Sequence, residues 1–490
     1  MIGRELIFNP SVGVSVFKRK TQAIAGLSAV IAFFTLSSAV LAADAELIAR
    51  GKYLAKGADC SACHTNGEAG AAFAGGYAIH SPMGEIYSTN ITPSKQYGIG
   101  SYTEEQFARA VREGVRPDGG HLYPAMPYPS YSRMTDEDVK ALYAYFMNEV
   151  PAVDAPAKET KLPFPFSIRA SMIGWNLLFL NNERFMPDAG HSAEWNRGKY
   201  LVDVLAHCGD CHTPRNLLMA SDSSQYLAGG DVGPWHAPNL TSDKVSGIGG
   251  WSDEALQSYL LTGKSEHART SGPMAEAVQH SLQYLTVDDT KAMIAYLRTV
   301  APIRTAGQTA PDFSHGEAAT SYDIAATASR RGGTVLTNTM DGADLYEQVC
   351  ASCHQSSGAG TRDGFYPALI KNTTTGQANA TDLVATIVYG VQREVGGHET
   401  LMPGFGEKSL VQPLTDTQIA SVSNYVLKTF GNASAKVTPQ DVATIRAGGP
   451  EALLAKLADP KILAAVGIAG LVVIVAVLAA VLRRRPRATA

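Results

Sequence analysis

The chain has 490 residues, enough for about three domains at a usual size of about 150 residues each. Charged residues make up 18% of it and hydrophobic residues 45%, and the formal net charge is -4, as in an ordinary globular protein. This balance gives no sign of the basic surface that nucleic-acid binding requires, so we expect no nucleic-acid partner.

The N-terminus has the pattern of a secretory signal peptide over residues 1–42. Basic residues precede an apolar run over 23–40, and small residues suited to signal peptidase follow at Val40-Leu41-Ala42-Ala43. The run contains threonine and serine, which fits a membrane anchor less well than a cleaved signal. We expect the mature chain to start near Ala43, outside the cytoplasm.

All six cysteines lie in three copies of one motif, Cys60-Ser61-Ala62-Cys63-His64, Cys208-Gly209-Asp210-Cys211-His212 and Cys350-Ala351-Ser352-Cys353-His354. Cys-x-x-Cys-His is the attachment site of a c-type haem, whose vinyl groups bond to the two thiols and whose iron binds the histidine. A lone Cys-x-x-Cys also occurs in redox dithiols and zinc sites, but a histidine follows every copy here. The sequence therefore predicts three covalently bound haem c groups.

The segments around the first two motifs repeat one another. Gly51-Lys52-Tyr53-Leu54 returns as Gly198-Lys199-Tyr200-Leu201, and Asn90-Ile91-Thr92 returns as Asn239-Leu240-Thr241. In all three units a helix is expected before the motif and a closing helix after a turn-rich segment. Helix N-caps are predicted at Thr103, Thr135 and Thr415, and the closing helix of the second unit is predicted over Thr286–Leu297.

The expected organisation follows from these repeats and from the composition between them. Prolines predict an extended segment over 151–165, and an Ala/Thr/Gly/Ser-rich segment over 301–340 is expected to drape over the domains or stay mobile. An apolar patch over 168–180 is too short to span a bilayer, and it packs either on its own domain or on a partner or membrane. The predicted parts are a signal peptide (1–42), domain 1 (43–150), a linker (151–190), domain 2 (191–300), a linker (301–340), domain 3 (341–432), a juxtamembrane segment (433–461), a transmembrane helix (462–482) and a basic tail (483–490).

Residues 462–482 are uncharged and mostly branched, and a cluster of arginines follows them. At about 1.5 Å per residue such a helix crosses a hydrocarbon core of about 30 Å. The arginines predict a cytoplasmic tail by the positive-inside rule, with the haem domains on the other side of the membrane. The predicted fold is therefore mostly α, with three tandem cytochrome c-type domains and a C-terminal transmembrane helix.

Each iron needs a sixth ligand, and a methionine thioether favours ferrous iron and raises the reduction potential. Methionines follow the first two motifs at equal spacing and the third at a shorter spacing. Filled axial sites suit electron transfer rather than oxygen chemistry. The predicted axial pairs are His64 with Met126, His212 with Met274, and His354 with Met402.

Other residues compete for these positions. Met83 is a rival for the first iron, although the second unit has no counterpart to it. His121, His267 and His398 lie shortly before the three predicted methionines, and ligation by two histidines would give lower potentials. The loops around Asn90, Asn239 and Pro367 are expected to pack on the haems and bond their propionates.

The motifs together resemble a known family. The segments Ser88–Pro93, Leu122–Tyr128 and His207–Arg215, with the closing helices, are similar to the triheme cytochrome c subunits of membrane-bound dehydrogenases of acetic acid bacteria. The resemblance covers nearly the whole mature chain. Within that group, Leu162–Ala170 and the hydrophobic C-terminus most resemble the fructose dehydrogenase cytochromes, with the alcohol, gluconate and sorbitol dehydrogenase cytochromes as relatives.

The resemblance implies an electron-transfer subunit that is not catalytic alone. In such complexes a large subunit oxidises a sugar or alcohol with FAD or pyrroloquinoline quinone, a small subunit accompanies it, and the cytochrome passes electrons to ubiquinone. The implied location is the cytoplasmic membrane of a Gram-negative bacterium, with the haem domains in the periplasm and the C-terminus in the cytoplasm. The alternatives are a free-standing membrane-anchored carrier to a terminal oxidase, and a haem peroxidase or nitrite-type reductase with an open axial site.

Overall fold

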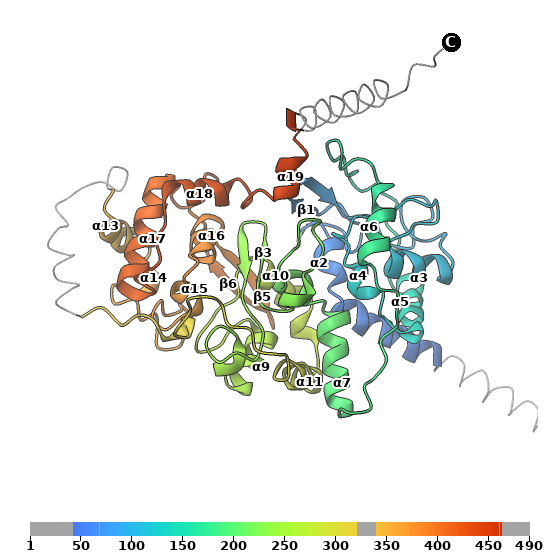
Figure 1. Ribbon diagram of the computed structural model, residues 1–490, viewed down its shortest axis with the longest axis horizontal. Helices are drawn as coiled ribbons and strands as arrows, with labels where there is room; N and C mark the ends of the chain where they lie inside the picture. The colour runs from blue at the N-terminus through green and yellow to red at the C-terminus, as the bar shows by residue number, and fades with distance from the viewer. Residues whose placement is uncertain (1–42, 68, 321–339, 460, 463–490) are drawn as a thin grey trace, which may run out of the picture.

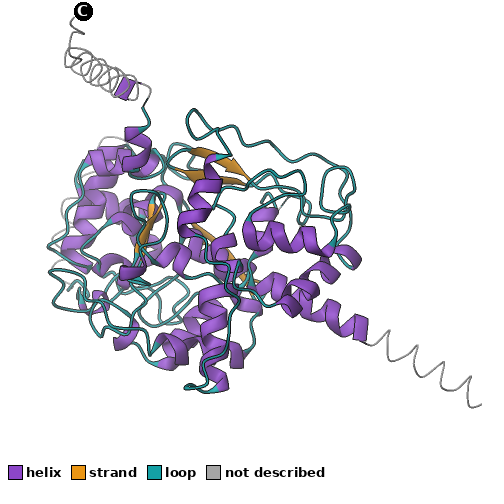
Figure 2. Cartoon of the chain, turned by 45° about the vertical axis from the view of Figure 1, so that its right-hand side comes forward, coloured by secondary structure: helices purple, strands orange, loops and turns teal. Residues whose placement is uncertain are grey.

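The computed structural model describes residues 43–67, 69–320, 340–459 and 461–462 (Figure 1). Helices joined by long turns dominate it, and the described residues also form three two-stranded antiparallel sheets (Figure 2). The mostly helical prediction is confirmed, but these hairpins were not expected. We refer below to residues 43–150, 191–300 and 341–432 as the first, second and third units.

The first two units follow the same plan. In the first, residues 43–57 are helical, and they precede α2 (Cys60–His64), β1 (Ala78–Ser81), β2 (Gly84–Tyr87), α3 (Glu104–Glu113), α4 (Tyr128–Tyr131) and α5 (Asp136–Asn148). The second contains α7 (Ala193–Tyr200), the π-helix η1 (Leu201–Leu205), α8 (Gly209–His212), β3 (Gly230–Val232), β4 (Trp235–Ala237), α9 (Asp253–Thr262), α10 (Gly272–His280) and α11 (Val287–Leu297).

The third unit is followed by two further helices. It contains α13 (Gly342–Val349), α14 (Ala351–His354), α15 (Thr373–Gly376), α16 (Thr381–Tyr389), β5 (Val391–Val395), β6 (His398–Met402) and α17 (Asp416–Phe430). After it come α18 (Pro439–Arg446) and α19 (Leu453–Leu457), and α6 (Ser171–Phe179) lies between the first two units.

The predicted helix starts are confirmed by their capping bonds. Thr103 and Thr415 each form a reciprocal capping box with the glutamine three residues later. Thr135 and Thr286 accept a hydrogen bond from the backbone N–H three residues on. These contacts are local, which is why the sequence alone could predict them.

A glycine lets the first helix of each unit cross its closing helix closely. A Cβ atom on Gly51 would lie 1.9 Å from the carbonyl oxygen of Ala141, and one on Gly198 would lie 1.8 Å from that of Ala292. The third unit repeats the contact, with 2.3 Å from Gly342 to the carbonyl oxygen of Ser421. Any side chain at these positions would push the two helices apart.

The first and second units share one hydrophobic core, whereas the third has a core of its own. The shared core runs from Leu54 and Phe146 in the first unit to Leu205 and Met293 in the second. The first two units are therefore packed as a pair, an arrangement that the predicted series of three tandem domains did not include.

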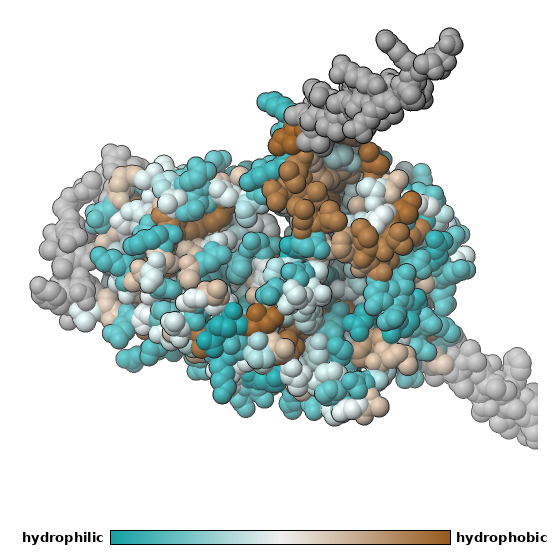
Figure 3. Space-filling model, viewed as in Figure 1, coloured by the Kyte–Doolittle hydropathy of each residue, from teal (hydrophilic) through white to brown (hydrophobic). Residues whose placement is uncertain are grey.

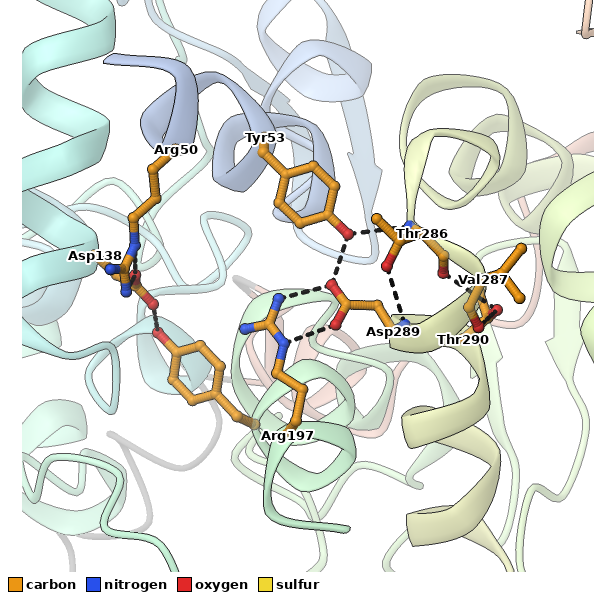
Figure 4. A network of polar contacts seen from close by, with 9 residues as sticks. Arg50, Tyr53, Asp138, Arg197, Thr286, Val287, Asp289 and Thr290 are labelled. Carbon is orange, nitrogen blue, oxygen red and sulfur yellow. Dashed lines mark hydrogen bonds and ion pairs between the residues drawn. The ribbon is translucent and has the colours of Figure 1, made fainter. Parts of the chain in front are cut away.

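A network of hydrogen bonds and ion pairs lies at the boundary between the first and second units (Figure 4). Within each unit an arginine pairs with an aspartate of the closing helix, Arg50 with Asp138 at 2.6 Å and Arg197 with Asp289 at 2.7 Å. The Tyr53 phenol of the first unit lies against Asp289 of the second, and it also accepts a hydrogen bond from the backbone N–H of Thr286.

The prediction that the fold includes a transmembrane helix needs correction. Among the residues that the structure describes, no helix is both long enough and apolar enough to cross a bilayer. Crossing takes about 20 residues, and α17 has 15. The predicted span over 462–482, apart from Ile462, the tail over 483–490 and the signal over 1–42 lie outside the described residues.

The linker over 151–190 is held against the units that it joins. Tyr128 of α4 donates a hydrogen bond to Asn176 of α6 at 2.7 Å, and Trp175 donates one to the carbonyl of Leu218 at 2.9 Å. The aliphatic side chains of Ile173 and Leu177 in α6 are exposed. The part of the second linker that is described, 301–320, lies across the second and third units and contacts both.

Candidate haem sites

The three Cys-x-x-Cys-His motifs all form short helical turns, in α2, α8 and α14. Just before the first two motifs, Asp59 and His207 have φ values of 55° and 40°, in the left-handed region. This reversal separates each motif turn from the helix that precedes it. None of these six cysteines forms a disulfide and each is half-buried, so their thiols are available for covalent attachment to a haem at the edge of a core.

The same hydrogen bond orients each motif histidine. The Nδ1 atom of His64 lies 2.6 Å from the carbonyl oxygen of Thr89, that of His212 lies 2.6 Å from Pro238, and that of His354 lies 2.9 Å from Pro367. A carbonyl can only accept, so Nδ1 carries the proton and Nε2 keeps its lone pair. Histidines that bind a metal through Nε2 are commonly held in this way.

Burial keeps these imidazoles neutral. It lowers the pKa of His212 to about 4, and it lowers the pKa of His64 and His354 as well. A neutral ring is the form that binds a metal ion. The described residues thus provide three equivalent sets of two thiols and one metal-binding nitrogen, which fit the chemistry of haem c.

The loops predicted to lie on the haems also orient the motif histidines. Thr89 and Pro238, whose carbonyls accept from His64 and His212, directly precede Asn90 and Asn239. The Asn90 side chain donates both of its N–H groups to the carbonyls of Val153 and Ala155 in the linker. Both N–H groups of the Asn90 amide are therefore engaged, and the packing of these loops on the haems stays a prediction. The repeated Asn-x-Thr segments were the signal in the sequence, but the orienting carbonyls were not recognised.

The predicted methionines lie in three different settings. Met126 is in the turn before α4, Met274 is in the first turn of α10, and Met402 ends β6. Each is partly buried against the core that also contacts the cysteines of its own unit. These positions are compatible with axial ligation, which stays a prediction.

The rival ligands are placed less favourably. Met83 lies in the β1–β2 turn, and His398 is exposed at the start of β6. His267 is engaged elsewhere, because its ring stacks on Phe313 with the centroids 4.2 Å apart. His121 differs, since its buried Nδ1 has no partner among the described residues.

The first two motifs lie close together. The Tyr131 phenol donates to the carbonyl of Ala58, two residues before Cys60, at 2.6 Å, and its ring meets His207 edge-on with the centroids 5.5 Å apart. Ser130 donates to Asp210, inside the second motif, at 3.1 Å. One short segment of the first unit thus touches both attachment sites.

The helix α10 joins all three units. From the second unit it reaches the first, where the Tyr77 phenol donates to Glu276 at 3.1 Å. On its other side it packs against β5 of the third unit (Figure 1), where the backbone N–H of Glu394 donates to Gln279 at 2.9 Å. The helix that carries Met274 therefore contacts the neighbouring units on both sides.

The mostly helical fold and the three Cys-x-x-Cys-His sites define a c-type cytochrome, and the comparison with known proteins agrees with this class. The family model for cytochrome c matches residues 48–148, 196–301 and 339–430, so the chain belongs to the cytochrome c family, whose cofactor is haem c. These matches cover each Cys-x-x-Cys-His motif.

Particular relatives narrow the class to cytochrome subunits. The fructose dehydrogenase cytochrome subunit of Gluconobacter japonicus is 57% identical over 447 residues, covering 90% of this chain and 92% of that protein. The cytochrome c subunit of the quinone alcohol dehydrogenase of Komagataeibacter europaeus is 39% identical over 85% of this chain and 89% of its own. The gluconate 2-dehydrogenase cytochrome c subunit of Pantoea cypripedii is 39% identical over 84% of this chain and 93% of its own. The resemblance seen in the motifs is confirmed, and the chain is similar to electron-transfer subunits rather than to catalytic ones.

Proposed function

We propose that this chain carries three haem c groups and is the electron-transfer subunit of a membrane-bound sugar dehydrogenase, passing electrons to ubiquinone. The observation that carries the proposal is the repeated orientation of His64, His212 and His354 by a backbone carbonyl. A bound haem c takes up and releases one electron reversibly. The chain supplies fixed ligands and an apolar surrounding, which tune the potential.

The packing of the units supports transfer within the chain. The segments that hold the first two motifs touch at Tyr131, and α10 links the second unit to the third through β5. A shared core and a fixed linker keep the attachment sites at constant separations. In this proposal the sixth ligands are Met126, Met274 and Met402. Both axial positions of each iron are then filled, so no substrate binds to the iron.

The partner is a large catalytic subunit bearing FAD or pyrroloquinoline quinone, together with a small subunit. Fructose is the first substrate to test, because the relative at 57% identity is named for it, against 39% for those named for alcohol and gluconate. The substrate pocket belongs to the partner in this proposal.

The proposed location is the periplasmic face of the cytoplasmic membrane of a Gram-negative bacterium. The secretory pattern over 1–42 supports it. Exposed apolar side chains also support it: Leu177 is 86% exposed and Leu178 is 67% exposed, and Figure 3 shows apolar surface gathered over α6 and α19. Such patches mark contact surfaces in folded proteins, and a lipid surface would bring ubiquinone within reach.

The deciding experiment uses the complex purified in mild detergent. Fructose, ethanol, gluconate and sorbitol are added separately, and reduction of the haem absorption band is followed with and without a ubiquinone analogue. Reduction by fructose and reoxidation by the quinone support the proposal. A cytochrome that purifies without a large subunit and responds to none of the substrates contradicts it and favours a free-standing carrier.

The surface over α6 has its own test in vesicles of phosphatidylethanolamine and phosphatidylglycerol containing ubiquinone. Leu177→Gln combined with Leu178→Gln should slow reduction of the vesicle quinone without slowing reduction of a water-soluble analogue. Leu410→Gln, at a leucine that is 100% exposed in the third unit, is the matched control. Equal rates for all proteins with both quinones would contradict membrane contact through α6.

A further inference from the structure

Arg393 of β5 is buried without a carboxylate partner. Its side chain belongs to the third unit but reaches into the second, where Nη1 donates to the carbonyl of Gly263 at 3.3 Å and to the carbonyl and hydroxyl oxygens of Thr270. The residue is 1% exposed, and its Nη2 has no hydrogen-bond partner among the described residues. The guanidinium of an arginine stays protonated at any ordinary pH, so Arg393 is a buried cation without a compensating anion.

The second unit leaves room for this guanidinium. Gly263 ends α9 with a φ of 68°, and a Cβ atom there would lie 2.8 Å from Arg393 Nη1 and 3.0 Å from its Cζ. Only glycine combines this backbone conformation with the empty space. The close approach is therefore built into the second unit as well as into β5.

Two more cations lie nearby. Lys264 and Arg269 flank the same segment. Burial lowers the pKa of each side chain, and the charge of Arg393 lowers the pKa of Lys264 further. Within the described ranges neither they nor Arg393 form an ion pair with a carboxylate. Arg269 donates to backbone carbonyls, including that of Ala268 at 2.9 Å. Arg393 is the buried member of this group of like charges, and a buried cation is costly unless an anion pairs with it.

The acidic groups that face this cluster are engaged elsewhere. Asp382 interacts with the buried Tyr259, which also faces Arg393, but its carboxylate accepts from the backbone N–H of His236 at 2.8 Å. Glu266 is exposed and pairs with His267 at 3.2 Å. The missing anion is therefore not supplied by these neighbouring side chains.

The cluster lies on the loop that leads into the helix carrying Met274, the predicted ligand of the second iron. Thr270 is four residues before Met274, and the segment from Gly263 to Thr270 joins α9 to α10. A haem attached at Cys208 and Cys211 brings two propionate carboxylates that need donors. Resting on the proposed attachment of that haem, we propose that Arg393 of the third unit, with Lys264 and Arg269, binds a propionate of the haem of the second unit.

This contact makes the third unit part of the second haem site. The positive charge of Arg393 favours the reduced haem, which carries one positive charge less than the oxidised form. A guanidinium paired with the propionate also holds that carboxylate ionised. The potential of the second haem thus depends on docking of the β5–β6 hairpin, and Arg393 is a positioning residue rather than a catalytic one.

The test is potentiometric titration of the purified full-length holoprotein, followed by its haem absorption. Arg393→Gln should shift the electron-transfer equilibrium of one haem about tenfold toward the oxidised form, about 59 mV for one electron, and leave the other two unchanged. The potential of that haem should also rise as the pH falls, because the released propionate takes up a proton. Arg393→Lys keeps the charge and should restore most of the potential.

Lys428→Gln is the control, because Lys428 is exposed on α17 of the same unit and the same charge is lost. Met274→His and Met402→His identify the steps of the second and third haems by their own shifts. Three unchanged potentials in Arg393→Gln, or a shift confined to the step that Met402→His moves, would overturn the inference. Haem content measured on every variant separates this failure from loss of the haem itself.

Discussion

The phenol of Tyr200 donates a hydrogen bond to Asp138 at 2.5 Å, from the second unit to the first. At the equivalent positions of the repeat, Tyr53 donates to Asp289 at 2.6 Å in the opposite direction. The two units thus exchange one hydrogen bond each, through carboxylates that are already paired with an arginine. The third unit has Asp344 and Gln418 at the corresponding places, instead of the tyrosine and the aspartate.

Loss of these phenols should weaken the pair of units. Tyr53→Phe and Tyr200→Phe are each expected to lower the free energy of unfolding by about 1 to 3 kcal/mol, because a carboxylate at the boundary loses a donor. Urea unfolding followed by circular dichroism measures the effect. Tyr97→Phe, at a residue that is 38% exposed, should change stability little. Equal stability of all three variants would show that the exchanged bonds do not hold the units together.

Each motif should hold its own haem. Replacing Cys350 and Cys353 by serine removes the thioether bonds of the third unit, whose core is separate from that of the pair. We therefore expect a stable protein with two haems instead of three. Intact-mass spectrometry and the absorbance of the haem in alkaline pyridine give the count. An unchanged count would disprove covalent attachment at the third motif.

The sixth ligand of the first iron should be Met126 and not Met83. Met126→His replaces a thioether by an imidazole and should lower one potential by at least about 59 mV, a tenfold change for one electron. Met83→Leu should leave all three potentials in place, because Met83 lies in the β1–β2 turn. The reverse pattern in the two titrations would move the ligand to Met83.

The pair of His236 and Asp231 should give a measurable pH dependence of stability. The two side chains lie 2.8 Å apart, and this hydrogen bond raises the pKa of His236 above its usual value of about 6.5. The raised pKa stabilises the fold fully below pH about 6.5, and the contribution is lost as the pH rises through the folded-state pKa.

Thermal unfolding between pH 6 and about 8.5 measures this contribution. The melting temperature of the unmodified protein should fall as the pH rises through this range. Asp231→Asn should flatten the profile, because the charged partner is gone. A profile that keeps its slope in Asp231→Asn would assign the titration to another group.

The sequence by itself determined the features that depend on neighbouring residues. The spacing of Cys60, Cys63 and His64 and its two repeats define the haem chemistry within five residues, and the caps at Thr103 and Thr415 need only the first turn of a helix. The resemblance to dehydrogenase cytochromes rests on similarly short segments. The hairpins were missed because they are only three to five residues long, with weak alternation of apolar and polar side chains.

The tertiary structure decided what depends on residues far apart in the chain. Tyr53 meets Asp289, and Arg393 enters the space left by Gly263, only because separate units pack together. The shared core of the first two units follows from the same packing. A periodic sequence shows which face of a helix is apolar, but it does not show which partner buries that face, because many pairings satisfy the hydrophobic effect and only side-chain fit and charge choose between them.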